Sequence, residues 1–157
     1  MPGSGKSTSG VILAKAAGME FVDTDLLIQR KTGKKLQEII DGSGIDCFLK
    51  TESDILADIS CKNSVISTGG SAVCTEKAMR HLKKMGTVIF LDVPVTELKR
   101  RISNITTRGI AMRKGQTLEA LFDERLPLYK RYADITVNGT DTEKAVEIIL
   151  KKSKPPV

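Results

Sequence analysis

The chain has 157 residues, a formal net charge of +6, 40% hydrophobic residues and 28% charged residues, which is typical of a single soluble domain. No apolar run approaches the roughly 18 residues of a membrane helix. Three separated cysteines without a CxxC pair, together with a single histidine, argue against a disulfide framework and a zinc site. The charge suits small anions as well as nucleic acid, but four phenylalanines and two tyrosines offer no platform for stacking bases. We therefore expect one cytoplasmic, monomeric domain over 1–157 that binds neither membrane nor nucleic acid.

Short apolar runs alternate with longer segments of helical spacing along the chain. The predicted helices span 7–17, 25–31, 35–41, 46–60, 76–84, 94–102, 118–132 and 141–151. The predicted strands span 20–23, 64–67, 87–91 and 134–137. The basic segment 104–117 has no clear periodicity and is predicted to be a lid loop. This alternation predicts an α/β fold in three layers, with a parallel sheet flanked by helices.

The chain opens on a glycine-rich turn ending in Gly5-Lys6-Ser7, the last part of the P-loop pattern G-x-x-x-x-G-K-[ST]. Its glycines let backbone N–H groups point inward at phosphate oxygens, and the following helix adds the positive charge of its N-terminus. The turn predicts an ATP and Mg²⁺ site in which Lys6 reaches the β- and γ-phosphates and Ser7 binds the metal. The predicted nucleotide-binding residues of the turn are Gly3, Ser4, Gly5, Lys6, Ser7 and Thr8.

The P-loop pattern is incomplete at its start. The first glycine of the pattern would precede Met1, and so would the apolar strand that leads into such a loop. That strand lies in the middle of a P-loop sheet, buried on both faces. We therefore expect a truncated N-terminus, with the first strand missing and the strands at 20–23 and 64–67 lacking a shared neighbour. A flexible glycine-rich start is the alternative interpretation.

Two acidic residues, Asp23 and Asp25, stand at the end of the first predicted strand. Ligands of open α/β sheets bind beyond the carboxyl ends of the strands. We predict that Asp23 supports Mg²⁺ and that Asp25 orients the attacking hydroxyl or accepts its proton. The alternative is that Asp25 only caps its helix.

Four further residues complete the predicted site. Gly69 and Gly70 follow the strand 64–67, where adjacent glycines let a ligand approach the backbone. Arg108, in the lid loop, is predicted to neutralise charge on the transferring phosphoryl group, while lid closure excludes water. Arg125 is predicted to bind a substrate carboxylate. The alternative interpretations are that Gly69 and Gly70 form only a turn, and that the two arginines are exposed to solvent and bind no ligand.

The ordered set of motifs resembles the shikimate kinase family over nearly the whole chain. Its most specific parts are Ile66-Ser67-Thr68-Gly69-Gly70 and Arg125-Leu126-Pro127-Leu128-Tyr129. The other matching segments are Gly3-Ser4-Gly5-Lys6-Ser7-Thr8, Phe21-Val22-Asp23-Thr24-Asp25, Gly33 with Glu38-Ile39-Ile40, Gly44 with Phe48 and Glu52, Leu91-Asp92-Val93-Pro94, Thr107-Arg108-Gly109 and Ala133-Asp134.

The resemblance implies a nucleoside-monophosphate-kinase-like fold with a five-stranded parallel sheet, a substrate-binding helical segment at about 25–60 and a lid at about 104–117. It implies transfer of the γ-phosphoryl group of ATP to the 3-hydroxyl of shikimate, in aromatic amino-acid biosynthesis. By position, it implies phosphate and metal binding by Lys6, Ser7 and Asp23. It implies substrate binding by Asp25, Gly69, Gly70 and Arg125, with Arg108 as the lid arginine and Lys6, Asp25 and Arg108 as the catalytic set.

Three positions depart from the family's pattern. In the segment Gly-x-x-x-Phe-Arg-x-x-Glu, the arginine that binds the substrate carboxylate is replaced here by Leu49, and helical geometry turns the neighbouring Lys50 about 100° further round. The third glycine after the strand is Ser71, and a glutamate near the Asp-x-Asp helix start is Gln29. Two alternatives therefore stay open: a kinase of the same fold for another small hydroxylated acid, and a nucleotide-binding module without catalysis.

Overall fold

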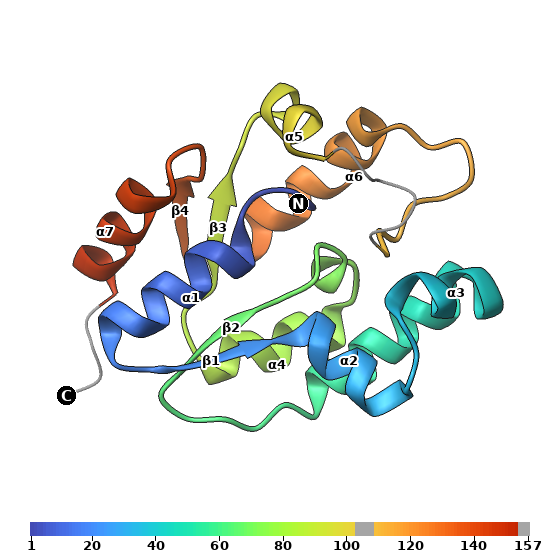
Figure 1. Ribbon diagram of the computed structural model, residues 1–157, viewed down its shortest axis with the longest axis horizontal. Helices are drawn as coiled ribbons and strands as arrows, with labels where there is room; N and C mark the ends of the chain where they lie inside the picture. Colours follow the sequence, from blue (N-terminus) through green and yellow to red (C-terminus); the bar gives the residue numbers. More distant parts are fainter. Residues whose placement is uncertain (103–108, 154–157) are drawn as a thin grey trace.

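A computed structural model describes residues 1–102 and 109–153, and its elements follow the predicted order (Figure 1). The strands are β1 (Glu20–Asp23), β2 (Ser64–Ser67), β3 (Ile89–Asp92) and β4 (Ile135–Asn138). The helices are α1 (Lys6–Ala17), α2 (Thr24–Thr32), α3 (Leu36–Ala57), α4 (Glu76–Met85), α5 (Val95–Arg101), α6 (Leu118–Tyr132) and α7 (Thr142–Lys152), with a 3₁₀ turn η1 at Ala72–Cys74. The predicted α/β class is confirmed.

The helices predicted at 35–41 and 46–60 form one element, α3, which contains a break. We expected Gly42 to end the first helix, but the chain remains helical there. The break lies at Gly44, whose φ of 81° and ψ of 165° are outside the helical region. A positive φ is accessible to glycine at little cost, so the chain bends at this residue and then resumes its helix toward Phe48.

The strands form two parallel pairs. In the first pair, β1 lies beside β2 with Phe21 opposite Val65, and in the second pair β3 lies beside β4 with Phe90 opposite Thr136. No described strand neighbours both β1 and β2, as expected, but the implied position of the missing strand between them was wrong, because these two strands pair directly with each other. The described residues thus form two separate two-stranded sheets. This differs from the single five-stranded sheet that the resemblance implies.

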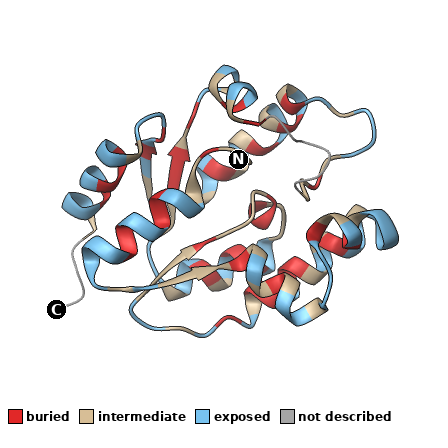
Figure 2. Ribbon diagram, viewed as in Figure 1, coloured by how far each residue is buried: buried red, intermediate tan, exposed pale blue. Residues whose placement is uncertain are grey.

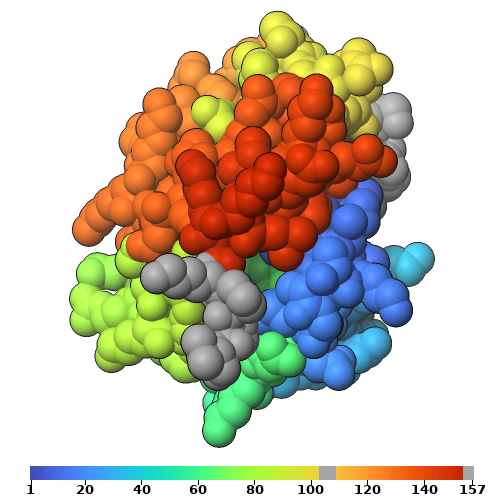
Figure 3. Space-filling view, turned by 90° about the vertical axis from the view of Figure 1, so that its left-hand side faces the viewer, coloured from blue at the N-terminus to red at the C-terminus, as the bar shows by residue number. Residues whose placement is uncertain are grey.

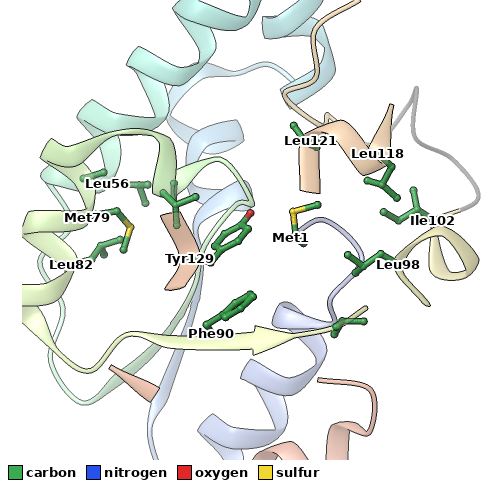
Figure 4. Packing of buried hydrophobic residues seen from close by; sticks show 14 of the residues in the cluster. Met1, Leu56, Met79, Leu82, Phe90, Leu98, Ile102, Leu118, Leu121 and Tyr129 are labelled. Carbon is green, nitrogen blue, oxygen red and sulfur yellow. The ribbon is translucent and has the colours of Figure 1, made fainter. Parts of the chain in front are cut away.

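The first residues of the chain lie between the two strand pairs. A Cβ built on Gly70, which follows β2, would lie 3.0 Å from Pro2 Cδ. A Cβ built on Gly3 would lie 2.7 Å from Ile102 Cγ1, just after α5. Figure 4 shows Met1 pointing into the same apolar cluster as Ile102. The turn that precedes α1 is therefore held from both sides of the molecule.

Helices cover both faces of the strands. On one face, α1 and α7 lie side by side (Figure 3) and bury an apolar cluster against β3 and β4 that includes Leu13, Leu91 and Val146. The larger cluster, on the other face, joins α3, α4, η1 and α6, and the rings of Phe90 and Tyr129 stack within it at 5.1 Å (Figures 2 and 4). Ser7, near the start of α1, lies within hydrogen-bond distance of Asp23 and Ser67, the last residues of β1 and β2, so the start of α1 lies at the carboxyl ends of this strand pair.

A third apolar cluster, which includes Ile28, Leu36 and Phe48, packs α2 against α3. It builds the helical segment at about 25–60 as a unit beside the strand ends (Figure 1). None of the helices within the described residues has the length and apolar character needed to span a membrane.

Candidate active site

The glycine-rich turn has the backbone geometry that a phosphate-binding loop needs. Gly3 and Gly5 have φ values of 73° and 86°, which other residues rarely adopt. Gly5 is the N-cap of α1 and provides no side-chain cap, so the first N–H groups of the helix are left for another acceptor. These donors and the helix dipole make the start of α1 an anion-binding position.

The turn forms one wall of a cleft of about 380 Å³. The predicted site residues that line this cleft are Gly3, Gly5, Lys6, Ser7, Thr8, Asp25, Gly69, Gly70 and Arg125. The structure thus brings together residues from α1, α2, α6 and the segment after β2. Ser4, also predicted to bind nucleotide, does not line the cleft, since its buried hydroxyl donates to the Met1 carbonyl at 2.9 Å. Arg108 lies outside the described residues.

Lys6 lies over the turn at the start of α1. Its Nζ donates to the Met1 carbonyl at 2.6 Å and to Ser4 Oγ at 3.4 Å, and the residue lines the cleft. The ammonium group is therefore held beside the open N–H groups of the helix. The charge of the ammonium group and the partial charges of these N–H groups together make this wall of the cleft positive.

Ser7, which lines the cleft, forms an oxygen pair with Asp23, which does not line it. Ser7 Oγ donates to Asp23 Oδ2 at 2.8 Å, while Asp23 Oδ1 accepts from the backbone N–H groups of Asp25 and Leu26. Asp23 is thus the N-cap of α2, and the alternative that Asp25 caps this helix was wrong. Hydroxyl and carboxylate oxygens are suitable Mg²⁺ ligands, and Mg²⁺ typically takes only one or two protein groups beside phosphates and water.

Asp25 and Glu52 both face Gly69. A Cβ built on Gly69 would lie 2.9 Å from Asp25 Oδ1 and 2.5 Å from Glu52 Oε1. The backbone of Gly69 is fixed by its N–H, which donates to Thr24 Oγ1 at 3.1 Å. Only a glycine leaves space for two carboxyl groups at this point, so Gly69 determines how closely they approach the segment after β2.

Arg125 is buried in the opposite wall, on α6, with 3% of its surface exposed. Its Nη2 donates to the Ala111 carbonyl at 2.5 Å, while its buried Nε has no hydrogen-bond partner among the described residues. Tyr129, one turn later, donates to the Gly70 carbonyl at 2.5 Å and joins α6 to the cleft floor. A buried guanidinium with an unused donor is well placed to bind an anionic ligand.

Two charged residues that line the cleft were assigned no role by the sequence analysis. Glu52 stands in the segment that carries the family resemblance, but no role was assigned to it, because its partners are distant in the sequence. Arg101 reads as one of several basic residues at the end of α5, yet its guanidinium is held by Glu97 and by the carbonyl groups of Gly139 and Thr140. Both residues line the cleft.

The two departures at the acceptor side differ in their consequences. Leu49 is half-buried in the α2–α3 apolar cluster and does not line the cleft. Ser71 lines the cleft and is buried, with 4% of its surface exposed. Position 49 therefore supplies no polar group to the cleft, while position 71 adds a hydroxyl.

Comparisons with known proteins agree with this geometry. The family model described as "Shikimate kinase" matches residues 2–154. The chain is 35% identical over 150 residues to the shikimate kinase of Aquifex aeolicus (strain VF5), covering 95% of this chain and 87% of that protein. It is 37% identical over 155 residues to that of Sulfurihydrogenibium sp. (strain YO3AOP1), covering 97% and 93%. The solved structure of Acinetobacter baumannii shikimate kinase in complex with shikimate superposes with a TM-score of 0.86 at 31% identity, covering 98% of this chain and 90% of that one.

Proposed function

The chain belongs to the shikimate kinase family, and on that premise we propose that it transfers the γ-phosphoryl group of ATP to the 3-hydroxyl of shikimate. It is a small-molecule kinase that uses ATP as phosphoryl donor. The observation that carries the proposal is the single cleft that joins an anion-binding helix start to a carboxyl group and a buried arginine. Phosphoryl transfer needs these parts in line, since catalysis is almost entirely positioning and charge stabilisation.

At the donor end, we assign the phosphates to the turn at Gly3 and Gly5, to the first N–H groups of α1 and to Lys6. Ser7 and Asp23, already hydrogen-bonded to each other, would hold Mg²⁺. The ion would supply charge neutralisation for the phosphates. The open N–H groups and the lysine support this assignment, because they converge on one wall of the cleft.

At the acceptor end, we assign the attacking hydroxyl to Asp25 and the acceptor carboxylate to Arg125. Gly69 and Gly70 would let the acceptor lie against the backbone. The unused Nε of Arg125 and the position of Asp25 in the same cleft support this orientation. A catalytic role for Arg108, in a lid at about 104–117, is a proposal from the resemblance.

The remaining assignments follow from the reaction class. We propose a single domain over 1–157 whose helical segment at about 25–60 carries the acceptor side. We also propose that the enzyme acts as a cytoplasmic monomer, binding only small molecules, because its reaction needs ATP and a small acid in one cleft.

The proposed acceptor is tested by a panel of small hydroxylated acids in an assay that couples ADP release to a signal. We expect turnover with shikimate at a kcat/KM at least about tenfold above that for any other acid of the panel. Turnover with another acid and none with shikimate would instead support the same-fold kinase suggested by Leu49. ATP binding without turnover of any acceptor would support a non-catalytic module.

Replacing Gly69 with alanine should damage the acceptor side selectively. The added Cβ would meet Glu52 Oε1 at 2.5 Å and Asp25 Oδ1 at 2.9 Å, so the carboxyl groups must move out of place. We expect kcat/KM for shikimate to fall by about tenfold to a hundredfold, with KM for ATP changed by less than about threefold.

The matched control for this change is Gly86→Ala. Gly86 ends α4 with extended backbone, and nothing lies within 4 Å of the Cβ that it would gain. Steady-state kinetics of the two variants should separate, with Gly86→Ala close to the unmodified enzyme. Equal effects of the two changes on shikimate kinetics would contradict the assigned position of the acceptor.

A further inference from the structure

Glu52 is a buried carboxyl group that opens onto the cleft and that the proposed reaction does not yet use. It lies on α3, with 1% of its surface exposed. Its Oε1 is enclosed and has no hydrogen-bond partner among the residues that the structure describes. A buried polar atom without a partner costs free energy unless a ligand or water supplies the missing bond. Since Glu52 lines the cleft, the ligand of that cleft is the natural partner.

The other residues on this turn of α3 do not provide a cation for Glu52. Residues three apart on a helix lie on the same face, but Leu49 is apolar and packs in the α2–α3 cluster. Lys50 is exposed and does not line the cleft. Among the described residues, the buried arginine that lines the cleft is therefore Arg125, and its charge acts on the Glu52 carboxyl group.

Groups from several other elements face Glu52. Those described are Lys6 on α1, Asp25 on α2, Ser71 after β2, Cys74 on η1, and Arg125 and Tyr129 on α6. The pKa of Glu52 is raised to about 7, first by burial and then by the neighbouring carboxylate of Asp25, against the lowering effects of a hydrogen bond with Ser71 and of the charges on Arg125 and Lys6. Two close carboxyl groups do not ionise together easily, so an ionised Asp25 favours a neutral Glu52.

We propose that Glu52 binds the acceptor as a neutral acid and donates a hydrogen bond to the acceptor carboxylate beside Arg125. An ionised Glu52 would repel this carboxylate and would pair with Arg125 instead. The neutral form leaves the guanidinium available and supplies a second polar contact that Leu49 cannot provide. Glu52 is then a specificity-determining residue for an anionic acceptor. This inference rests on the proposed function.

The proposal has a pH dependence of defined sign. The acceptor binds the protonated form, so its affinity is full below the pKa of Glu52 and falls as the pH rises through it. Between about pH 7 and about pH 8.5 we expect KM for shikimate to rise roughly tenfold, with KM for ATP changed by less than about twofold. Calorimetric titration of the enzyme with shikimate at about pH 8 should show uptake of close to one proton, measured from the dependence of the heat on the buffer.

Glu52→Gln is the variant that isolates the titration. Its amide group can donate the same hydrogen bond but cannot ionise, so KM for shikimate should stay low and flat over this pH range and proton uptake should disappear. Asp54→Asn is the matched control, since Asp54 lies on the same helix but is exposed and paired with Lys77 at 2.6 Å. This control should retain the pH dependence of the unmodified enzyme.

The pH dependence of KM for shikimate in the unmodified enzyme and in the two variants decides whether Glu52 has this role. A rise in KM for shikimate that is lost in Glu52→Gln and kept in Asp54→Asn supports the proposal. If the unmodified enzyme turns over shikimate with a KM that is independent of pH, the proposal is overturned. This test does not require Glu52→Gln to fold, because it uses the unmodified enzyme alone. An unchanged rise in Glu52→Gln also overturns the proposal. No turnover of shikimate at any pH overturns the proposed function itself.

Discussion

Replacing Lys6 with alanine is expected to lower kcat by about a hundredfold to a thousandfold. The reason is that Nζ lies beside the open N–H groups of α1, where it would stabilise the charge of the transferring phosphoryl group. The ADP-coupled assay at saturating shikimate measures this effect. Part of the binding of ATP should be lost as well, because the same charge acts on the ground-state phosphates.

Two comparisons keep the Lys6 result interpretable. Lys15→Ala removes an exposed lysine from the last turn of the same helix and should leave kcat unchanged within about twofold. Thermal unfolding shows whether Lys6→Ala is folded, since the change also removes the hydrogen bond to the Met1 carbonyl, worth about 1 kcal/mol. A folded Lys6→Ala enzyme with the kcat of the unmodified protein would show that the phosphates bind elsewhere.

Replacing Asp25 with asparagine is expected to lower kcat by about a hundredfold to ten-thousandfold while the affinity for ATP changes by less than about threefold. Asparagine keeps the shape of the side chain against Gly69 but cannot accept a proton. Asp23, not Asp25, caps α2, so the exchange should leave the helix intact. Turnover kinetics and direct titration with ATP separate the two quantities.

The control for Asp25 is Asp46→Asn, which removes an exposed carboxylate from α3 without touching the cleft. It should match the unmodified enzyme in both measurements. If Asp25→Asn weakened ATP binding and left kcat intact, Asp25 would belong to the donor end of the site. Its assignment to the attacking hydroxyl would then be wrong.

The fold class could be predicted because local patterns decide it. Alternating apolar runs and helical segments gave the order of all four described strands and their helices, and the positions of Gly18 and Gly33 marked two helix ends correctly. The break in α3 was placed at Gly42 and lies at Gly44, because either glycine can adopt the required angles and only packing selects between them. The pairing of β1 with β2 is likewise a property of the folded chain.

The residues that line the cleft could be predicted most directly where a motif is contiguous. The turn around Gly5 is a contiguous motif, and so is the pair of Asp23 and Asp25. The sequence alone could therefore indicate both. Glu52 was missed because its significance depends on Gly69 and Arg125, which approach it only in the folded chain. The inward direction of the Ser4 hydroxyl could not be predicted, because the pattern specifies a backbone path and not the direction of this side chain.

Phosphorus NMR of a mixture of the protein, Mg·ATP and shikimate tests the central claim most directly. The account predicts that the γ-phosphate signal of ATP declines while ADP and a phosphate monoester of shikimate appear in equal amounts, with the new phosphorus coupled to the proton at position 3 of the ring. Release of inorganic phosphate without a shikimate ester, or an ATP spectrum unchanged by shikimate, would contradict it.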